Sequence, residues 1–517
     1  MTKDEREQIE ALLSNPDMLL KKRPFFRKVS QKSGRERKHD MDVTGFVTAQ
    51  LPDIEMTPVS QAQFMRELDV DSHDVLFDDN IPSITVKLND GGYLDMKQHR
   101  MAVPFQKLIR NKQVRHLCVN TMSHTLLNTN PTDAQKKNFI RFKQGWVEKN
   151  MEGAKTKFVQ DQKSYGDAGL LFFIKNGVLR TKNINYADGY VIISHKDDSG
   201  AHILECLYYA VTDADGNSTT YLDCYDDEKM TRFTNKFEAG TGEINGWVRH
   251  PAVEHGFSEC PLVTKRGEVA WNNGQTTITS YEALYNTFVV IEKRHGWGAL
   301  YLRGKINQNG QKIAGAVVIN DTSGDEHADA KYLTPPSPQN MIETLELMEQ
   351  TIMKSCGTTF ILPKDIKISG DTSGLAVEMT QELDMATAQD GVIEWQNAAN
   401  KMSRLFKEGL AIELVRSGEK DFGEAITEFD DMRILTEFRV WKPKSEEGHN
   451  QMLATLKGAG GISQQTLVEK NTVSTPDEMA RIQREHEEQL REQEERAIKA
   501  AELAQSTSEQ TVVSEKD

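Results

Sequence analysis

The sequence predicts an α+β fold, because its hydrophobic periodicity changes twice along the chain. Apolar residues recur at helical spacing within residues 98–160. Between residues 165 and 240 the pattern becomes short apolar runs separated by turn signals such as Lys175-Asn176-Gly177, which is typical of β-hairpins. Helical spacing returns after residue 270. Helices on both sides of a β-rich segment favour an α+β protein with several parts.

Composition excludes several classes of protein. The net charge of −15 argues against a tight, indiscriminate hold on nucleic acid, because such binding depends on Lys and Arg neutralising phosphates. No apolar run approaches the about 18 residues that a membrane span needs. The five cysteines form no CxxC pair, and neither HExxH nor a phosphate-binding GxxxxGK[ST] motif occurs. We therefore predict no catalytic residue, no bound metal, no cofactor and no membrane association.

The N-terminal forty residues combine a helical pattern with a basic segment, "KKRPFFRKVSQKSGRERKH". This segment is either a flexible arm or a partner-binding edge, and the sequence leaves both possibilities open. Further along, Asp213-x-Asp215-x-Asn217 resembles the start of a calcium-binding loop. The Gly at the sixth loop position and the Glu at the twelfth are missing, so we predict a hairpin turn there.

Two helices of similar length are predicted after residue 270. The first covers 277–295, and the second runs from Pro338 to about Lys354. The residues between them, 298–334, contain short β segments such as "GALYLRG" and "IAGAVVIN". The helices are expected to run antiparallel, with the β segments at their shared end.

The tetrapeptide Asp-Thr-Ser-Gly occurs twice, at 321–324 and 371–374. Aspartic proteases also use two Asp-containing loops, but their Gly directly follows Thr or Ser, whereas here a Ser intervenes. The second copy also precedes the longest helical pattern of the chain, roughly Leu375 to Leu414. A role at the start of that helix is therefore favoured over catalysis. We assign this start and hinge to Gly370, Asp371, Ser373 and Gly374, because small oxygen-bearing side chains cap helices and glycine permits tight turns.

Four stretches in this order resemble segments of the portal proteins of tailed bacteriophages, of the siphophage type. They are "QKSYGDAGLLFFIKNG", "VEHGFSECPLV" with "WNNGQTTI", "KISGDTSGLAVEMTQELDMATAQ", and "LKGAGGISQQTLVEKNTVSTPDEMARIQREHEEQ". Together they cover about residues 160–490. The third is similar to the Ser-Gly-hydrophobic-Ala stretch that begins the family's long helix, with Ser373, Gly374, Leu375 and Ala376 in the matching places.

The resemblance implies the portal fold and its subdivision. The implied parts are a wing at 1–275 with an arm at 1–40 and a β-rich half at 165–240, a first stem helix at 276–297, a clip at 298–335, a second stem helix at 336–357, a tunnel loop at 358–374, a long kinked wing helix and returning strand at 375–440, a helical crown at 441–500 and a disordered acidic tail at 501–517. The kinks would lie at Gly391 and Gly409.

The resemblance also implies a non-enzymatic function in the virion. Portal proteins form rings of twelve subunits at one capsid vertex, through which a terminase motor packages DNA and from which the DNA is later ejected. The implied partners are further copies of the chain, double-stranded DNA, the large terminase subunit, the head–tail adaptor, and the major capsid and scaffolding proteins. The implied location is the portal vertex, preceded by the host cytoplasm during assembly. The alternatives are another structural capsid or connector protein and, less favoured, a hydrolase.

The resemblance directs attention to two sets of charged residues. Lys364 and Lys367 on the implied tunnel loop are candidates for DNA contact, and their alternative role is loop solubility. Glu343, Glu346 and Glu349 on the second stem helix are candidates for an acidic channel wall. Their alternative role is that of a solvated helix face.

Overall fold

The structure is a computed structural model that describes residues 3–30, 54–77, 84–87, 93–96, 100–197, 202–238, 242–243, 246–295, 299–303, 317–321, 329–333, 339–359, 382–416, 432–440 and 446–461, and isolated positions at 418, 429, 467, 482, 484, 486–488 and 491. The chain divides into two compact units. Unit 1 comprises Met1–Leu362 and Gln381–Trp441, and unit 2 comprises Pro363–Thr380 and Lys442–Asp517. Each unit is described by itself.

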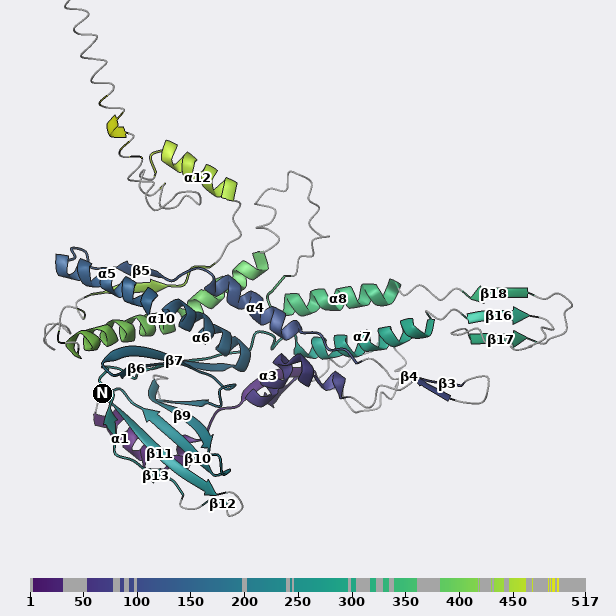
Figure 1. Cartoon of the computed structure of the whole chain (residues 1–517), viewed down its shortest axis with the longest axis horizontal. Helices are drawn as coiled ribbons and strands as arrows, with labels where there is room; N and C mark the ends of the chain where they lie inside the picture. Colours follow the sequence, from purple (N-terminus) through teal and green to yellow (C-terminus); the bar gives the residue numbers. More distant parts are fainter. Residues whose placement is uncertain are drawn as a thin grey trace, which may run out of the picture. The chain divides into compact units, whose positions relative to one another are not determined.

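A layer of helices builds much of the core of unit 1 (Figure 1). Its members are α4 (Phe105–Cys118), α5 (Asp133–Glu148), α6 (Met151–Tyr165) and α10 (Glu382–Arg416). Helix α5 begins with a capping box, in which Thr132 Oγ1 accepts from the Gln135 N–H at 3.2 Å and Gln135 Oε1 accepts from the Thr132 N–H at 3.0 Å. Asn150 starts α6 directly afterwards in a left-handed conformation, with φ of 50°.

The segment 165–240, for which β-strands were predicted, contributes most strands to two antiparallel sheets. The smaller sheet has the order β15–β6–β7, with β6 at Asp167–Lys175, β7 at Val178–Ile184 and β15 at Leu262–Arg266. The larger sheet has the order β12–β11–β10–β9–β8, and two short strands, β13 and β14, also pair with β11. Its strands are β8 (Val191–Lys196), β9 (His202–Thr212), β10 (Ser218–Tyr225), β11 (Lys229–Glu238), β12 (Gly242–Glu243), β13 (Val248–Arg249) and β14 (Val253–Glu254).

The turn between β9 and β10 confirms the hairpin prediction for Asp213-x-Asp215-x-Asn217. The Asp213 N–H donates to the Asn217 carbonyl at 2.9 Å, and Asp213 Oδ1 accepts from the Asn217 N–H at 2.9 Å. Gly216 supplies the positive φ, 86°, that this turn requires. The Asp213 carboxylate therefore stabilises a β-turn.

The largest hydrophobic cluster lies where α10 packs on α5, α6 and the smaller sheet. Trp395 of α10 is fully buried, and its ring meets that of Phe158 edge-on with centroids 5.0 Å apart. The helix predicted from Leu375 to Leu414 is observed as α10, and its expected first residues lie outside the described part. The described helix continues through both Gly391 and Gly409. At Gly409 an added Cβ would lie 2.5 Å from Leu179 Cδ1, so glycine permits close packing there.

One strand lies within the stretch 98–160, for which helix was mainly expected. Strand β5 (Ser123–Leu126) pairs antiparallel with β19 (Ile434–Glu437), which the sequence did indicate as a strand. His124 of β5 lies against the rings of Phe142 and Trp146, with centroid distances of 5.2 and 4.6 Å. The partner strand is distant in sequence, so the local pattern around β5 did not reveal this pairing.

The N-terminal segments cover other parts of unit 1. Helices α1 (Lys3–Leu13) and α2 (Pro16–Leu19) bury Ile9, Leu13 and Leu19 in the cluster of the larger sheet. The next elements are β1 (Phe25–Ser30), β2 (Ile54–Val59), α3 (Gln61–Leu68), the 3₁₀ turns η1 (Val70–Ser72) and η2 (Asp74–Leu76), β3 (Ile84–Lys87) and β4 (Tyr93–Met96). Strand β1 pairs antiparallel with β2, and β3 with β4. Ser60 caps α3 by accepting from the Gln63 N–H.

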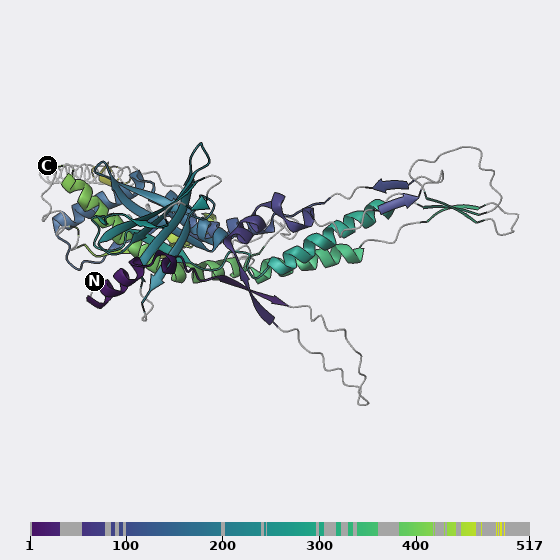
Figure 2. The same cartoon turned by 90° about the horizontal axis from the view of Figure 1, so that it is seen from below.

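Helices α7 (Gln275–His295) and α8 (Gln339–Ser355) lie side by side in two perpendicular views (Figures 1 and 2), and we call them the helix pair. A Cβ on Gly274, just before α7, would meet Cys356 at the end of α8. Further along, Tyr281 lies near Glu349. The pair is therefore antiparallel, as predicted.

Between the two helices in sequence, β17, β16 and β18 form a sheet in that order. Their bounds are β16 Ala299–Arg303, β17 Val317–Asp321 and β18 Asp329–Leu333. Strand β16 runs parallel to β17 and antiparallel to β18. The β segments expected between the two helices are thus present.

In unit 2, helix α12 (Glu446–Gly458) is followed by a turn in which Gly460 has a φ of 73°. This matches the helix and glycine turn expected at the start of the crown segment. The later helices of that prediction fall mostly outside the described residues.

Candidate functional site at the base of the helix pair

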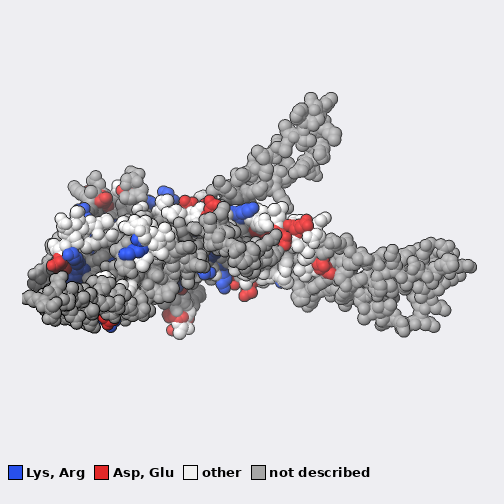
Figure 3. All heavy atoms as spheres, turned by 90° about the horizontal axis from the view of Figure 1, so that it is seen from above, with Lys and Arg blue, Asp and Glu red and all other residues white. Residues whose placement is uncertain are grey.

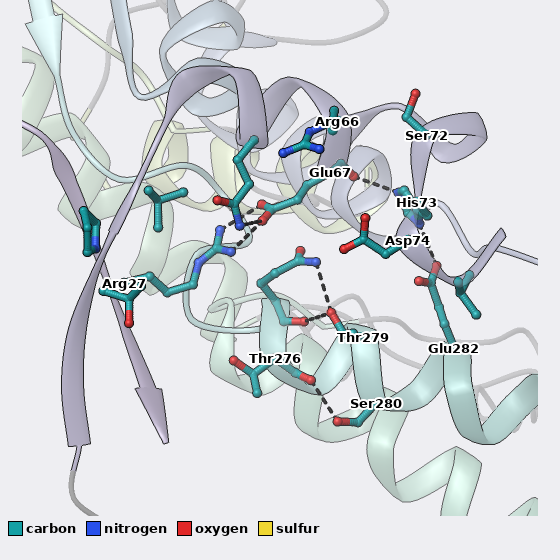
Figure 4. A pocket seen from close by; sticks show the side chains of 16 residues that line it. Arg27, Arg66, Glu67, Ser72, His73, Asp74, Thr276, Thr279, Ser280 and Glu282 are labelled. Carbon is teal, nitrogen blue, oxygen red and sulfur yellow. Dashed lines mark hydrogen bonds and ion pairs between the residues drawn. The ribbon is translucent and has the colours of Figure 1, made fainter. Parts of the chain in front are cut away.

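A pocket of about 480 Å³ lies beside the start of α7. Its walls come from β1, β2, α3, the turns η1 and η2, and α7 (Figure 4). The α7 wall consists largely of small hydroxyl side chains, namely Thr276, Thr279 and Ser280. Charged side chains from the other elements line the rest of the pocket, and most of them are held in two buried networks.

The first network joins β1, α3 and the residues that lead into α7. Arg27 Nη1 and Nη2 donate to the two carboxylate oxygens of Glu67 at 2.6 and 2.8 Å, which is a bidentate pair. Trp271 Nε1 donates to Glu67 Oε2 at 2.8 Å, and Arg27 Nε donates to Asn272 Oδ1 at 3.1 Å. Arg27 is buried, so this network fixes the base of α7 against the N-terminal segments.

The second network joins turn η2 to α7. Glu282 Oε1 lies 2.7 Å from His73 Nδ1 and accepts from the Val103 N–H at 2.8 Å, while His73 Nε2 lies 2.8 Å from the Glu67 carbonyl. Burial by itself lowers the pKa of His73, but the hydrogen bond and charge of Glu282 outweigh it, so that the pKa is raised above its ordinary value. Protonated His73 then donates to both neighbours.

This arrangement predicts a pH-dependent contribution to stability. Because the pKa of His73 is raised in the folded state, its contribution is complete below the unfolded pKa of about 6.5 and is lost as pH rises through the folded value. We expect the difference in melting temperature between the wild type and His73→Gln to shrink as pH increases from about 5 to about 8.5. Differential scanning fluorimetry across this range measures it.

The comparison with His73→Gln is needed because other histidines titrate in the opposite sense. Burial lowers the pKa of His124 to about 4, and it also lowers the pKa of His255. His124 and His255 therefore favour the folded state at higher pH. Both are present in the wild type and in His73→Gln, so their effect cancels in the difference between the two proteins. A difference that stays constant or grows with pH contradicts the proposed charge on His73.

The three glutamates of α8 that the sequence singled out do not share one environment. Glu343 and Glu346 are exposed on α8, and acidic side chains are visible at the surface around this helix in Figure 3. Glu349 is half-buried, and together with burial its charge raises the pKa of Tyr281 on α7. Glu343 and Glu346 therefore present their charge to the outside, whereas Glu349 lies at the seam of the helix pair.

A buried cluster fastens the two ends of the segment 360–381 to each other. Thr359 precedes this segment, and its N–H donates to Oδ1 of Asp384, in the first turn of α10, at 3.1 Å. Thr359 Oγ1 donates to Asp384 Oδ2, and Lys112 Nζ of α4 pairs with the same oxygen at 2.9 Å. Thr387 Oγ1 also donates to the Gly357 carbonyl at 2.8 Å. The segment therefore leaves and re-enters the fold at one place.

The sequence-predicted loop residues fall within this segment. Lys364, Lys367, Gly370, Asp371, Ser373 and Gly374 all lie outside the described residues. Their roles in DNA contact and at the helix start stay predictions. The structure describes the attachment points on either side of them.

The buried networks were not predicted from the sequence, although each left a signal. Glu282 follows the buried Ile278 by one helical turn, and Asp384 precedes the buried Ala388 by one turn. Both are carboxylates at positions where helical spacing places a buried side chain. A charged residue on an otherwise apolar helix face indicates a buried partner, which sequence alone does not identify.

Within the part of the chain that the structure describes, no group of three or more His, Cys, Asp or Glu residues could hold a metal ion. The same part contains no helix that is both long and apolar enough to cross a membrane. No individual curated protein matches the chain significantly. The family model described as "Phage portal protein, SPP1 Gp6-like" matches residues 91–494, which include the helix pair and α10.

Proposed function

Since the chain belongs to the SPP1 Gp6-like family of phage portal proteins, a structural and non-enzymatic family, we propose that twelve copies form a closed ring at one vertex of the capsid. The ring encloses a channel through which DNA enters during packaging and leaves during ejection. The helix pair with its inserted sheet is the single observation that carries this proposal. Two long helices that pack on each other, and that each leave an outer face exposed, suit repetition around a ring.

The family's parts are assigned to the observed elements on this basis. Helices α7 and α8 are the stem, and β16–β18 belong to the clip. Helix α10 with β19 forms the long wing helix and its returning strand, and the sheets before α7 belong to the wing. Residues 358–374 are the tunnel loop, and α12 lies in the crown. The cluster of Asp384, Lys112 and Thr359 then anchors the tunnel loop at both ends.

The electrostatics of the channel follow from the need for DNA to move. A wall that paired with many phosphates would hold DNA too tightly for translocation. We assign Glu343 and Glu346 to an acidic wall that prevents such adhesion, with Glu349 contributing less because it is half-buried. Lys364 and Lys367 are assigned to transient DNA contact, repeated in each subunit around the ring.

The proposed partners are those of a packaging vertex. The clip end faces the large terminase subunit during packaging and the head–tail adaptor afterwards. The wing contacts the major capsid and scaffolding proteins. The protein assembles in the host cytoplasm and remains in the virion.

Negative-stain microscopy and mass photometry test the ring. We expect particles with a central hole and a mass near twelve times the 58.4 kDa subunit. Monomers without a hole would contradict the proposal.

The double variant Lys364→Glu, Lys367→Glu tests the loop assignment. We expect this variant to form rings but to package less DNA, because reversed charge repels the phosphates. Protected DNA per capsid is the measurement. The matched control is Lys136→Glu, Lys137→Glu, which reverses two exposed charges on α5. Normal packaging by the loop variant would remove the assignment of Lys364 and Lys367.

A further inference from the structure

The two outer faces of the helix pair differ in a complementary way. On α7, the exposed side chains form a stripe of small, uncharged residues, namely Thr276, Thr279, Ser280, Ala283 and Thr287. On α8, Leu347 is 64% exposed and projects from a stripe that also contains Asn340, Thr344 and Thr351. The outer face of α7 therefore carries only small side chains, whereas that of α8 carries a large apolar side chain that remains mostly exposed to water.

These two faces lie at the same level of the helix pair. Because α7 and α8 are antiparallel and Tyr281 lies near Glu349, Ala283 is level with Leu347. Ala283 and Leu347 are both exposed, whereas the buried residues of both helices, such as Ile278 and Ile352, face the shared hydrophobic cluster. Each outer face thus points away from the other helix.

Two charged residues near the start of α7 and the end of α8 could also pair between neighbouring copies. Lys354 is the basic residue of α8, it is exposed, and it has no ion pair among the described residues. Near the start of α7, Asp74 is exposed at the rim of the pocket and likewise has no described ion pair. Lys354 and Asp74 are of opposite sign, and both lie toward the end of the helix pair at which α7 begins and α8 ends.

We propose that the outer face of α8 in one copy docks on the outer face of α7 in the next copy. Leu347 lies on the small-residue stripe around Ala283, and Lys354 lies beside Asp74 of the neighbour. The acidic flank of α8, with Glu343 and Glu346, stays outside this contact. The inference rests on the proposed ring and identifies the surfaces that close it. Because the two surfaces differ, the contact is heterologous and repeats around a ring without ending in a dimer.

Cysteine cross-linking tests this contact directly. All five native cysteines are buried, so exposed cysteines introduced by mutation will dominate oxidation. In Ala283→Cys, Leu347→Cys, mild oxidation should give a ladder of covalent multimers on non-reducing gels. Within one chain the two positions lie on the far sides of helices whose axes are about 8–10 Å apart, beyond the about 7 Å Cα separation that a disulfide spans. Each single variant should remain uncross-linked.

The outcomes separate this inference from the proposed function. If mass photometry shows rings but the double variant yields only monomers after oxidation, the docking surfaces are wrong and the ring stands. If Leu347→Cys alone gives dimers, the contact is isologous and the proposal is overturned. If no rings form, the proposed function itself fails.

Charge reversal provides a second test that needs no oxidation. Asp74→Lys and Lys354→Asp should each weaken association by about two- to fivefold per interface, as for exposed ion pairs. The combination Asp74→Lys, Lys354→Asp should recover association, because the pair is restored with reversed signs. The measurement is the ring fraction at limiting concentration. A combined variant that assembles no better than the single variants overturns this part of the contact.

Discussion

Replacing Asp384 with alanine is expected to lower the free energy of unfolding of unit 1 by about 3–5 kcal/mol. The Asp384 side chain is buried and accepts hydrogen bonds from both the N–H and the hydroxyl of Thr359. It also pairs with Lys112, whose side chain is only 19% exposed. The alanine variant removes the carboxylate that this ammonium and the Thr359 N–H share in a largely buried site, which is costly because buried polar groups lose hydration without full replacement.

The matched control for this prediction is Asp390→Ala. Asp390 lies on the same helix but is exposed, so its loss should change stability by less than about 0.5 kcal/mol. Chemical denaturation followed by tryptophan fluorescence compares the two variants. If Asp384→Ala behaves like Asp390→Ala, the buried cluster does not hold the fold as described.

The Asp384 cluster also links stability to the proposed channel. It joins the residues before and after the segment 360–381, so its loss should free both ends of the proposed tunnel loop. We expect rings of Asp384→Ala that do form to package DNA less efficiently than those of the Asp390→Ala control. Protected DNA per capsid measures this effect. Equal packaging by both rings would show that the loop does not depend on its anchor.

The main helices of this chain were predictable because their periodicity is long and local. The patterns in 277–295 and from Pro338 to Lys354 indicated α7 and α8, and the pattern before Leu414 indicated α10. A helix satisfies its backbone hydrogen bonds within itself, so its sequence contains most of its signal. Strand β5 shows the opposite case, because its hydrogen bonds are completed by β19, far along the chain.

The candidate site was less predictable, for a related reason. A carboxylate such as Glu282 is recognisable as a buried position by its spacing, but its partner His73 comes from a segment more distant in sequence. Glu349 carries the same kind of signal, because it follows the buried Leu345 by four residues and precedes the buried Ile352 by three. It is half-buried and lies near Tyr281, whereas Glu343 and Glu346 are exposed.

Replacing Trp395 with alanine is expected to cost about 3–5 kcal/mol of folding stability. The indole is fully buried in the largest cluster, against Phe158 and, at a centroid distance of 6.2 Å, Phe438. These neighbours belong to α6 and to the residues after β19, which are fixed by their own hydrogen bonds, so the cavity will not collapse. Thermal and chemical denaturation measure the loss.

Trp395→Phe provides the informative comparison. The Trp395 Nε1–H is buried and has no hydrogen-bond partner in the described part of the chain, so phenylalanine removes an unsatisfied donor while it keeps much of the apolar volume. We expect a loss below about 1.5 kcal/mol. Equal losses for both variants would contradict the packing described here.

The cluster around Trp395 is separate from that of the helix pair, so folded Trp395→Ala subunits that also carry Ala283→Cys and Leu347→Cys should still cross-link. Stability of the core around α10 and closure of the proposed ring would then be shown to depend on different residues.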